Sequence, residues 1–191
     1  MNLEKMFEMQ KALDERIIKE KGLEGQDLLP NLILALQVEL AECANEWRGF
    51  KHWSNDREPR TKHPLEVSPN GAFRKGGNPL LEEYVDCLHF ILSIGNRIGY
   101  SNKNTKKLEG GTLRSNLDVA DQVGVFSDVF EAIVMVREDI SLSRLGPKAS
   151  YALLFRRFNN LGKMLGFTPE QIESAYMDKN AVNHQRQQEG Y

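Results

Sequence analysis

Residues 32–44 read LILALQVELAECA, and only Gln37, Glu39 and Glu42 among them are polar. A helix that is apolar on nearly all sides is expected to be buried, so this segment limits the folds open to the chain. Residues 80–94, LLEEYVDCLHFILSI, are also mostly apolar, except for one narrow polar stripe whose members are spaced three and four residues apart. Both segments favour a fold built from buried helices.

Helical periodicity recurs along the chain, whereas strand signals are nearly absent. Pro30 and Pro79 each fit the first position of a helix. Thr168, Pro169 and Gln171 give the last helix a clear start, with a capping threonine and a glutamine three residues later. The sequence therefore predicts an all-α helical bundle of five or six helices. The predicted helices cover residues 3–20, 30–49, 79–98, 117–142, 147–165 and 169–188.

Two segments interrupt the helices of what we expect to be a single domain spanning residues 1–191. Residues 54–79 hold four prolines and three glycines, which indicates a long surface loop inserted into the domain. Residues 101–116 are polar and contain glycine, so they are expected to form a linker. We interpret the loop as a solvated insertion, with a lid that adds positive charge as the alternative. Its basic residues are Arg57, Arg60, Lys62, Arg74 and Lys75.

The composition of the chain limits the compartment in which the protein is expected and the partners that it is expected to bind. The 27 acidic and 25 basic residues nearly balance, whereas a protein that binds duplex nucleic acid usually shows a basic excess. Cys43 and Cys87 lie in apolar helical runs, which predicts free, buried thiols in a reducing compartment. The N-terminus carries charges where a signal peptide needs an apolar core, and no apolar stretch is long enough to span a bilayer. We therefore expect a cytoplasmic protein without a membrane or nucleic-acid partner.

Carboxylates stand out within the two apolar helices. Glu39 and Glu42 are three residues apart and project from one helix face, and Glu83 and Asp86 lie in the polar stripe of the other helix. Buried carboxylates that repel each other are costly, and a divalent cation would resolve the repulsion. Magnesium prefers such oxygen ligands. The alternative is that these are ordinary solvated faces. His89 is expected to be a hydrogen-bonded residue behind the ligands or a contact to a bound base.

Longer stretches around these carboxylates resemble a known family. The E-x-x-E pattern at Glu39–Glu42, followed by E-x-x-D at Glu83–Asp86, resembles the all-α nucleoside triphosphate pyrophosphatases of the MazG-like superfamily. The flanking segments are similar to the dimeric dUTPases. About forty residues separate the two patterns, which is longer than is typical for that family and reflects the inserted loop. The similar segments, in chain order, are MQKALDERI (9–17), VELAECANEWRGFKHWS (38–54), LLEEYVDCLHFILSIG (80–95) and AYMDKNAVNHQRQQEGY (175–191).

This resemblance implies an activity, a cofactor and a set of site residues. The implied reaction is the hydrolysis of dUTP to dUMP and pyrophosphate, with dUDP as a further substrate, by a homodimer that uses two or three Mg²⁺ ions. This reaction would keep uracil out of DNA. The implied metal ligands are Glu39, Glu42, Glu83 and Asp86, which would also form the catalytic centre. The implied substrate contacts are Gln10 and His89 to the nucleoside, Trp53 to the base, Lys51, Lys179 and Arg186 to phosphates, and Asn183 and Tyr191 to sugar or base.

The residues themselves support part of this assignment and leave rivals open. Lys179, Asn183 and Arg186 share one helix face, and lysine and arginine on one face suit a polyphosphate. Glu39 is our choice for the carboxylate that orients the attacking water. One rival is a related pyrophosphatase for dCTP or a damaged nucleotide, and a second is a non-enzymatic helical adaptor. A di-iron bundle needs Glu-x-x-His on two helices, and only Asp86–His89 has a similar spacing.

Overall fold

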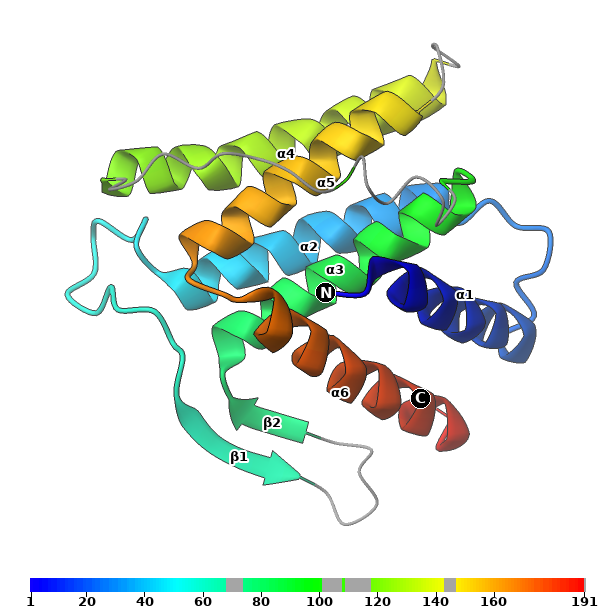
Figure 1. The fold of residues 1–191 in the computed structure, drawn as a ribbon, viewed down its shortest axis with the longest axis horizontal. Coiled ribbons are helices and arrows are strands. Elements are labelled where there is room, and N and C mark those ends of the chain that lie inside the picture. The colour runs from blue at the N-terminus through cyan, green and yellow to red at the C-terminus, as the bar shows by residue number, and fades with distance from the viewer. Residues whose placement is uncertain (68–73, 101–107, 109–117, 143–146, 191) are drawn as a thin grey trace.

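The computed structural model describes residues 1–67, 74–100, 108, 118–142 and 147–190 (Figure 1). Over these ranges the chain forms a bundle of six α-helices and one pair of short strands, which confirms the predicted all-α class. No helix in this part of the chain is long and apolar enough to cross a membrane. The elements are α1 (Leu3–Glu20), α2 (Leu29–Trp47), β1 (His63–Val67), β2 (Arg74–Gly77), α3 (Pro79–Arg97), α4 (Val119–Ser141), α5 (Lys148–Met164) and α6 (Pro169–Gln188).

The helices are arranged around the two apolar segments identified in the sequence. Helices α2 and α3 pack against each other at the centre of the bundle. Helices α4 and α5 form a pair that covers one side, with α4 against α2, whereas α1 and α6 both pack on α3 from the other side (Figure 1). The side chains of Cys43 and Cys87 are buried as free thiols in the core of this arrangement, as expected. Helix α3 therefore touches elements on all sides, which explains its nearly continuous apolar sequence.

The segment predicted as a surface loop, 54–79, contains regular structure. Strands β1 and β2 pair antiparallel, with His63 opposite Gly77 and Val67 opposite Arg74. These strands are too short to give a clear alternation of apolar and polar residues, so the sequence pattern did not reveal them. The predicted linker, 101–116, lies outside the described residues except for Leu108, which is buried in the core.

Side-chain caps fix where the helices that carry the polar residues begin. The side chain of Asn78 accepts a hydrogen bond from the backbone of Leu81, and Pro79 occupies the first turn of α3. Helix α6 starts with a complete capping box, in which Thr168 and Gln171 each accept a hydrogen bond from the other's backbone N–H. These caps satisfy N–H groups that have no partner within the helix.

A close contact between α3 and α5 gives the fold one stringent packing requirement. The ring of Tyr84 stacks on Phe158 at a centroid distance of 4.2 Å, and its hydroxyl donates a hydrogen bond of 3.2 Å to the Phe158 carbonyl. Gly162 lies beneath this ring, and a Cβ at that position would come within 2.7 Å of Tyr84 Cζ. Tyr84 is fully buried and cannot move away freely.

We therefore expect Gly162→Ala to lower the free energy of unfolding by about 1–3 kcal/mol. Denaturant titration followed by circular dichroism would measure the change. Gly124→Ala is the matched control, because Gly124 is an exposed helical residue of α4 with open space around its Cα. That substitution should raise the stability by about 0.5–1 kcal/mol through helix propensity. Equal effects of the two substitutions would contradict this account of the α3–α5 contact.

Candidate active site

Three carboxylates from the central helix pair converge. Glu39 on α2 and Glu83 and Asp86 on α3 each offer an oxygen, and these oxygens lie within 4.8 Å of one another. All three side chains are half-buried. The predicted convergence of the two carboxylate patterns is therefore present for three of the four residues. Glu42 lies one turn further along α2, and it is exposed and outside this cluster.

The three carboxylates carry more negative charge than the surrounding protein compensates. Burial, assisted by the charges of Asp86 and Glu42, raises the pKa of Glu39 to about 7. Burial and the charges of Asp86 and Glu39 raise the pKa of Glu83 to about 8. Glu42 acts on both groups in the same direction. Hard oxygen ligands that are close together and poorly compensated fit a divalent cation such as Mg²⁺.

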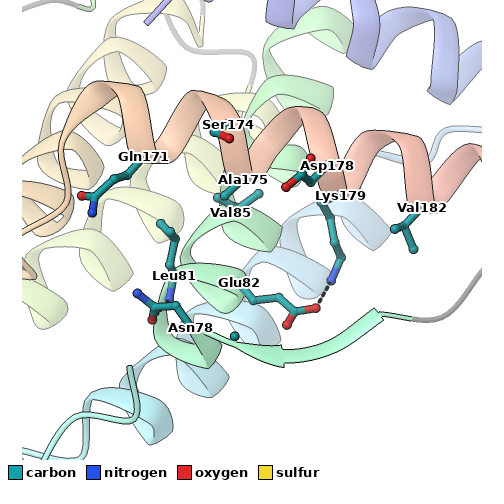
Figure 2. A pocket seen from close by; sticks show the side chains of 11 residues that line it. Asn78, Leu81, Glu82, Val85, Gln171, Ser174, Ala175, Asp178, Lys179 and Val182 are labelled. Atoms are coloured by element: carbon teal, nitrogen blue, oxygen red, sulfur yellow. Dashed lines mark hydrogen bonds and ion pairs between the residues drawn. The ribbon is translucent and has the colours of Figure 1, made fainter. Parts of the chain in front are cut away.

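Lys179 on α6 contacts this acidic cluster directly. Its Nζ lies 2.6 Å from Asp86 Oδ2 and 3.1 Å from Glu82 Oε1, and Figure 2 shows the side chain reaching from α6 to Glu82. Burial lowers the pKa of Lys179, but the carboxylates of Asp86 and Glu82 more than offset this and raise it overall. Lys179 is therefore a permanent positive charge at the edge of the cluster. Its side chain lines two cavities, one of about 370 Å³ and one of about 310 Å³.

The larger cavity extends from the acidic cluster along α3. Asp86, His89, Ser93 and Arg97 line it in one row, which follows the helix for roughly 16 Å. Half-buried apolar side chains from α1 and α2 also line the cavity, and Leu32 of α2 lies about two helical turns before Glu39. Seven of the residues predicted for the site line this cavity, and they come from four helices. They are Gln10, Glu39, Asp86, His89, Lys179, Asn183 and Arg186.

A hydrogen-bonded network centred on Gln10 forms one wall of the cavity. The carbonyl oxygen of the Gln10 side chain accepts hydrogen bonds from His89 Nδ1 at 2.7 Å and from the Tyr176 hydroxyl at 3.0 Å. Its amide nitrogen donates to Asp14 Oδ1 at 2.8 Å and to Ser93 Oγ at 3.0 Å. A glutamine amide offers two donors and two acceptor sites, so all four are occupied. Gln10 thus orients its neighbours.

His89 is a neutral residue in this wall. Burial, together with the charge of Lys179, lowers the pKa of His89 to about 3. Because Nδ1 donates to Gln10, Nε2 carries a lone pair, and this atom is buried with no hydrogen-bond partner in the part of the chain that is described. The ring also stacks on Tyr176 at a centroid distance of 4.3 Å. The hydrogen bond to Gln10 agrees with the expectation of a hydrogen-bonded histidine, whereas the contact of His89 with a substrate stays a prediction.

The sequence analysis did not single out Asp14. This residue lines the cavity and accepts hydrogen bonds from Gln10 and from the Ser93 hydroxyl, the latter at 3.0 Å. Burial raises the pKa of Asp14 to about 6, against the opposing effect of these hydrogen bonds. One signal was present in the sequence: Asp14 follows Gln10 by four residues, which places both polar groups on one face of α1.

The lining of this cavity does not include two further predicted substrate contacts, Trp53 and Lys51. Trp53 is 67% exposed and contacts the rings of Phe50 and His52. Lys51 does not line the cavity either, and its ammonium group lies over the Phe50 ring at 5.6 Å from the centroid. Tyr191 lies outside the described residues. The roles of these residues stay predictions.

Comparison with known proteins shows which family the chain belongs to. A family model described as dUTPase matches residues 2–67 and 71–191, which is nearly the whole chain. The chain belongs to the dUTPase family. This dUTPase is therefore a nucleoside triphosphate pyrophosphohydrolase, a dUTP diphosphatase, and its substrate is a nucleotide. Enzymes of the family generally use a divalent metal ion, in keeping with the acidic cluster. The alternative hypothesis of a non-enzymatic helical adaptor is therefore wrong. No curated protein matches the chain.

Proposed function

We propose that this dUTPase hydrolyses dUTP to dUMP and pyrophosphate in a reaction that depends on Mg²⁺, that it also cleaves dUDP, and that it thereby keeps uracil out of DNA. The observation that carries the proposal is the cluster of Glu39, Glu83 and Asp86, two of which, Glu39 and Asp86, line a cavity. At about 370 Å³ this cavity is in the range of small-molecule sites. A lining that combines carboxylates, basic residues and apolar side chains suits the phosphates and the base of a nucleotide.

The residues that would hold Mg²⁺ are Glu39, Glu83 and Asp86, with Glu42 completing the set when two or three ions bind. When bound, Mg²⁺ would neutralise the charge of the phosphates and lower the pKa of a coordinated water. Glu39 both lines the cavity and has a pKa raised to about 7. Once Mg²⁺ binding has ionised Glu39, its carboxylate would orient the attacking water and accept its proton.

Basic residues of α6 would stabilise the departing pyrophosphate. Lys179 contacts Asp86, and the positive charge of Arg186 also acts on Asp86, so both cations lie near the acidic cluster. Positive charge placed where negative charge develops stabilises the transition state of phosphoryl transfer. Asn183 lies on the same face of α6 and lines the cavity between them, where it would contact the sugar.

Release of pyrophosphate from dUTP, with Mg²⁺ and with excess EDTA, tests the proposal most directly. We expect turnover with Mg²⁺, loss of turnover with EDTA, recovery on adding Mg²⁺, and formation of dUMP from dUDP. A parallel assay with dCTP should show a far smaller kcat/KM. Turnover that is unaffected by EDTA, or a preference for dCTP, would refute the proposal.

Magnesium affinity should rise steeply with pH. In the metal-free protein Glu39 and Glu83 have pKa values of about 7 and 8, so both are mainly protonated at pH 6. Mg²⁺ needs the ionised forms and must displace these protons, so the Kd should fall about tenfold per pH unit for each proton released, and level off above pH 8. Titration calorimetry at pH 6, 7 and 8 in buffers of different ionisation enthalpy would report both the affinity and the proton release. A Kd that is constant over this range would contradict the raised pKa values.

We further propose that the enzyme is a homodimer, as its sequence resemblance implies. Large apolar side chains are exposed on α2, where Leu34 is 62% and Val38 is 48% exposed, and on α4, where Val119 is 56% exposed. Burying such side chains against a second copy is favourable. Light scattering after size exclusion should give twice the 21.8 kDa mass of the chain. A monomer at micromolar concentration would exclude this assembly.

A further inference from the structure

Lys179 is held between two carboxylates that differ in their surroundings. Asp86 is one of the three converging carboxylates, whereas Glu82 lies one helical turn earlier on α3 and is not a member of that cluster. The ammonium group of Lys179 donates a hydrogen bond of 2.6 Å to Asp86 and one of 3.1 Å to Glu82. In their ionised forms the three groups are therefore a chain of alternating charge, negative at both ends.

This chain of charges is poorly solvated. The side chain of Lys179 is 14% exposed, that of Asp86 is 17% exposed and that of Glu82 is 28% exposed. An ammonium group in such a place is costly unless a negative charge lies beside it. Lys179 therefore needs at least one carboxylate partner in every state of the enzyme.

The first turn of α3 presents Glu82 as a stable negative charge. Its backbone N–H donates a hydrogen bond of 3.0 Å to the carbonyl of the capping residue Asn78, which orders this turn. Negative charge is favoured at the N-terminus of a helix, because it is stabilised by the helix dipole. Figure 2 shows the Glu82 side chain directed at the end of Lys179. Glu82 is thus a counter-charge that does not depend on the state of the acidic cluster.

The balance between the two partners of Lys179 changes when the cluster holds Mg²⁺. Asp86 is then in contact with a doubly charged cation, which weakens its attraction for the ammonium group. Glu82 stands outside the cluster and keeps its charge for Lys179. Both Glu82 and Lys179 line the second cavity, of about 310 Å³, so there is space beside them on this side of α6.

We propose that Glu82 is a positioning residue for Lys179, which it holds at the edge of the acidic cluster when Mg²⁺ is bound to Asp86. Lys179 then stays out of the metal site and remains available to the phosphates of the substrate. The inference rests on the proposed function, because it takes Mg²⁺ as the ion that the cluster holds. Without the charge of Glu82, Lys179 would rely on Asp86 as its counter-charge and would compete with Mg²⁺ for it.

The Glu82→Gln substitution removes this charge at nearly constant shape, and the amide oxygen can still accept a hydrogen bond. Titration calorimetry of the nucleotide-free protein at pH 8 should show that the Kd for Mg²⁺ rises about tenfold. Glu82→Asp keeps the charge on a shorter side chain and should recover part of the affinity. The matched control is Glu4→Gln, because Glu4 is also an acidic residue in the first turn of a helix but is exposed on α1. It should leave the Kd unchanged.

The same substitution in a Lys179→Met background separates positioning from direct attraction. The charge of Glu82 would also attract Mg²⁺ directly, and that effect does not need Lys179. We expect Glu82→Gln to raise the Kd by less than about twofold in the Lys179→Met background, against about tenfold in the presence of Lys179. An equal rise in both backgrounds would overturn the proposal. The titrations are made at low temperature, where the less stable variants stay folded.

Nitrogen NMR of the lysine side chains reports on Lys179 itself. Its Nζ signal is identified by its absence from the spectrum of Lys179→Met. In the wild type with saturating Mg²⁺ the ammonium protons should stay protected from exchange with water, because Glu82 still accepts a hydrogen bond from them. Glu82→Gln with saturating Mg²⁺ should lose this protection. Equal protection in the two proteins would overturn the role of Glu82.

Failure of this inference and failure of the proposed function are distinguishable. A wild-type protein that binds Mg²⁺ but does not hydrolyse dUTP would refute the proposed function, while the Mg²⁺ titrations would still decide the role of Glu82. An unchanged Kd for Mg²⁺ in Glu82→Gln, together with normal Mg²⁺-dependent turnover of dUTP by the wild type, would overturn the role of Glu82 alone.

Discussion

Replacing Glu83 with glutamine should reduce dUTP turnover at least about 1,000-fold and make the metal-free enzyme more stable. The loss of activity follows because Glu83 is one of three converging carboxylates proposed to hold the metal. The gain in stability follows from the pKa of Glu83, which burial and the neighbouring charges of Asp86 and Glu39 raise to about 8. A carboxyl that binds its proton more tightly in the folded state makes the protein less stable as pH rises above the unfolded pKa.

The pH dependence gives this prediction a definite sign. Between about pH 4.5 and pH 8 the folded protein retains the proton that the unfolded chain has lost, so the penalty grows across this window and is complete above it. Glutamine removes the penalty. We expect a gain in the free energy of unfolding of about 1–2 kcal/mol at pH 8, after allowing for the partial exposure of Glu83, and almost none at pH 4.

Thermal denaturation at pH 4 and pH 8 in EDTA, together with a turnover assay at saturating Mg²⁺, would check both halves of the prediction. Glu8→Gln is a suitable control, since Glu8 is an exposed residue of α1, and neither activity nor stability should change appreciably. A Glu83→Gln variant that keeps near-normal turnover would remove this carboxylate from the proposed metal site. A variant that is less stable at pH 8 would show that its charge is compensated in the native protein.

Replacing Lys179 with methionine should also reduce turnover, by about 100- to 1,000-fold, but its effect on stability should have the opposite sign. The Lys179 side chain is only 14% exposed and pairs with Asp86 at 2.6 Å and Glu82 at 3.1 Å. Removing one partner of such a pair leaves uncompensated charge in a poorly solvated place. We expect the metal-free variant to lose about 2–4 kcal/mol of stability at neutral pH.

Protonation and metal binding should each relieve this loss. Burial already raises the pKa of Asp86, and removal of Lys179 takes away the main opposing effect. The loss should therefore shrink as the pH falls and Asp86 takes up a proton. Saturating Mg²⁺ should restore part of the stability at neutral pH, because it compensates the same carboxylates. Denaturant titrations with and without Mg²⁺ would measure this, with Lys5→Met on the exposed face of α1 as the control. A loss of stability that is the same at every pH would show that the lysine side chain stabilises the protein through its packing and not through its charge.

The part of the site formed by the central helices could be predicted from the sequence, because helical periodicity fixes which side chains share a face. Glu83 and Asp86 had to project together from α3, and an apolar α2 had to be buried beside it. The boundaries of α1 and α6 followed from equally local signals, such as the capping box at Thr168. These features depend on neighbours within one or two helical turns.

Features that depend on contacts between distant segments were not predictable in this way. The complete hydrogen bonding of Gln10 involves residues 4, 79, 83 and 166 positions away along the chain, so no local pattern indicates it. The hydrogen bonds that Asp14 accepts from Gln10 and Ser93 belong to the same network. The antiparallel pairing of β1 and β2 also joins segments whose own sequences carry little strand preference. Family resemblance suggested Gln10 as a ligand contact, whereas its amide in this structure is directed entirely at other side chains.

The hydrogen bonds around Gln10 all run in one direction. His89 and Tyr176 donate to its oxygen, its nitrogen donates to Ser93 and Asp14, and Ser93 donates onward to Asp14. The dipoles of these groups are therefore aligned, and their positive ends collect at the Asp14 carboxyl group. Such alignment favours the ionised carboxylate where burial alone would favour the neutral acid. Inside the bundle, oriented neutral groups and the charge of Arg97 thus offset part of the effect of burial on Asp14.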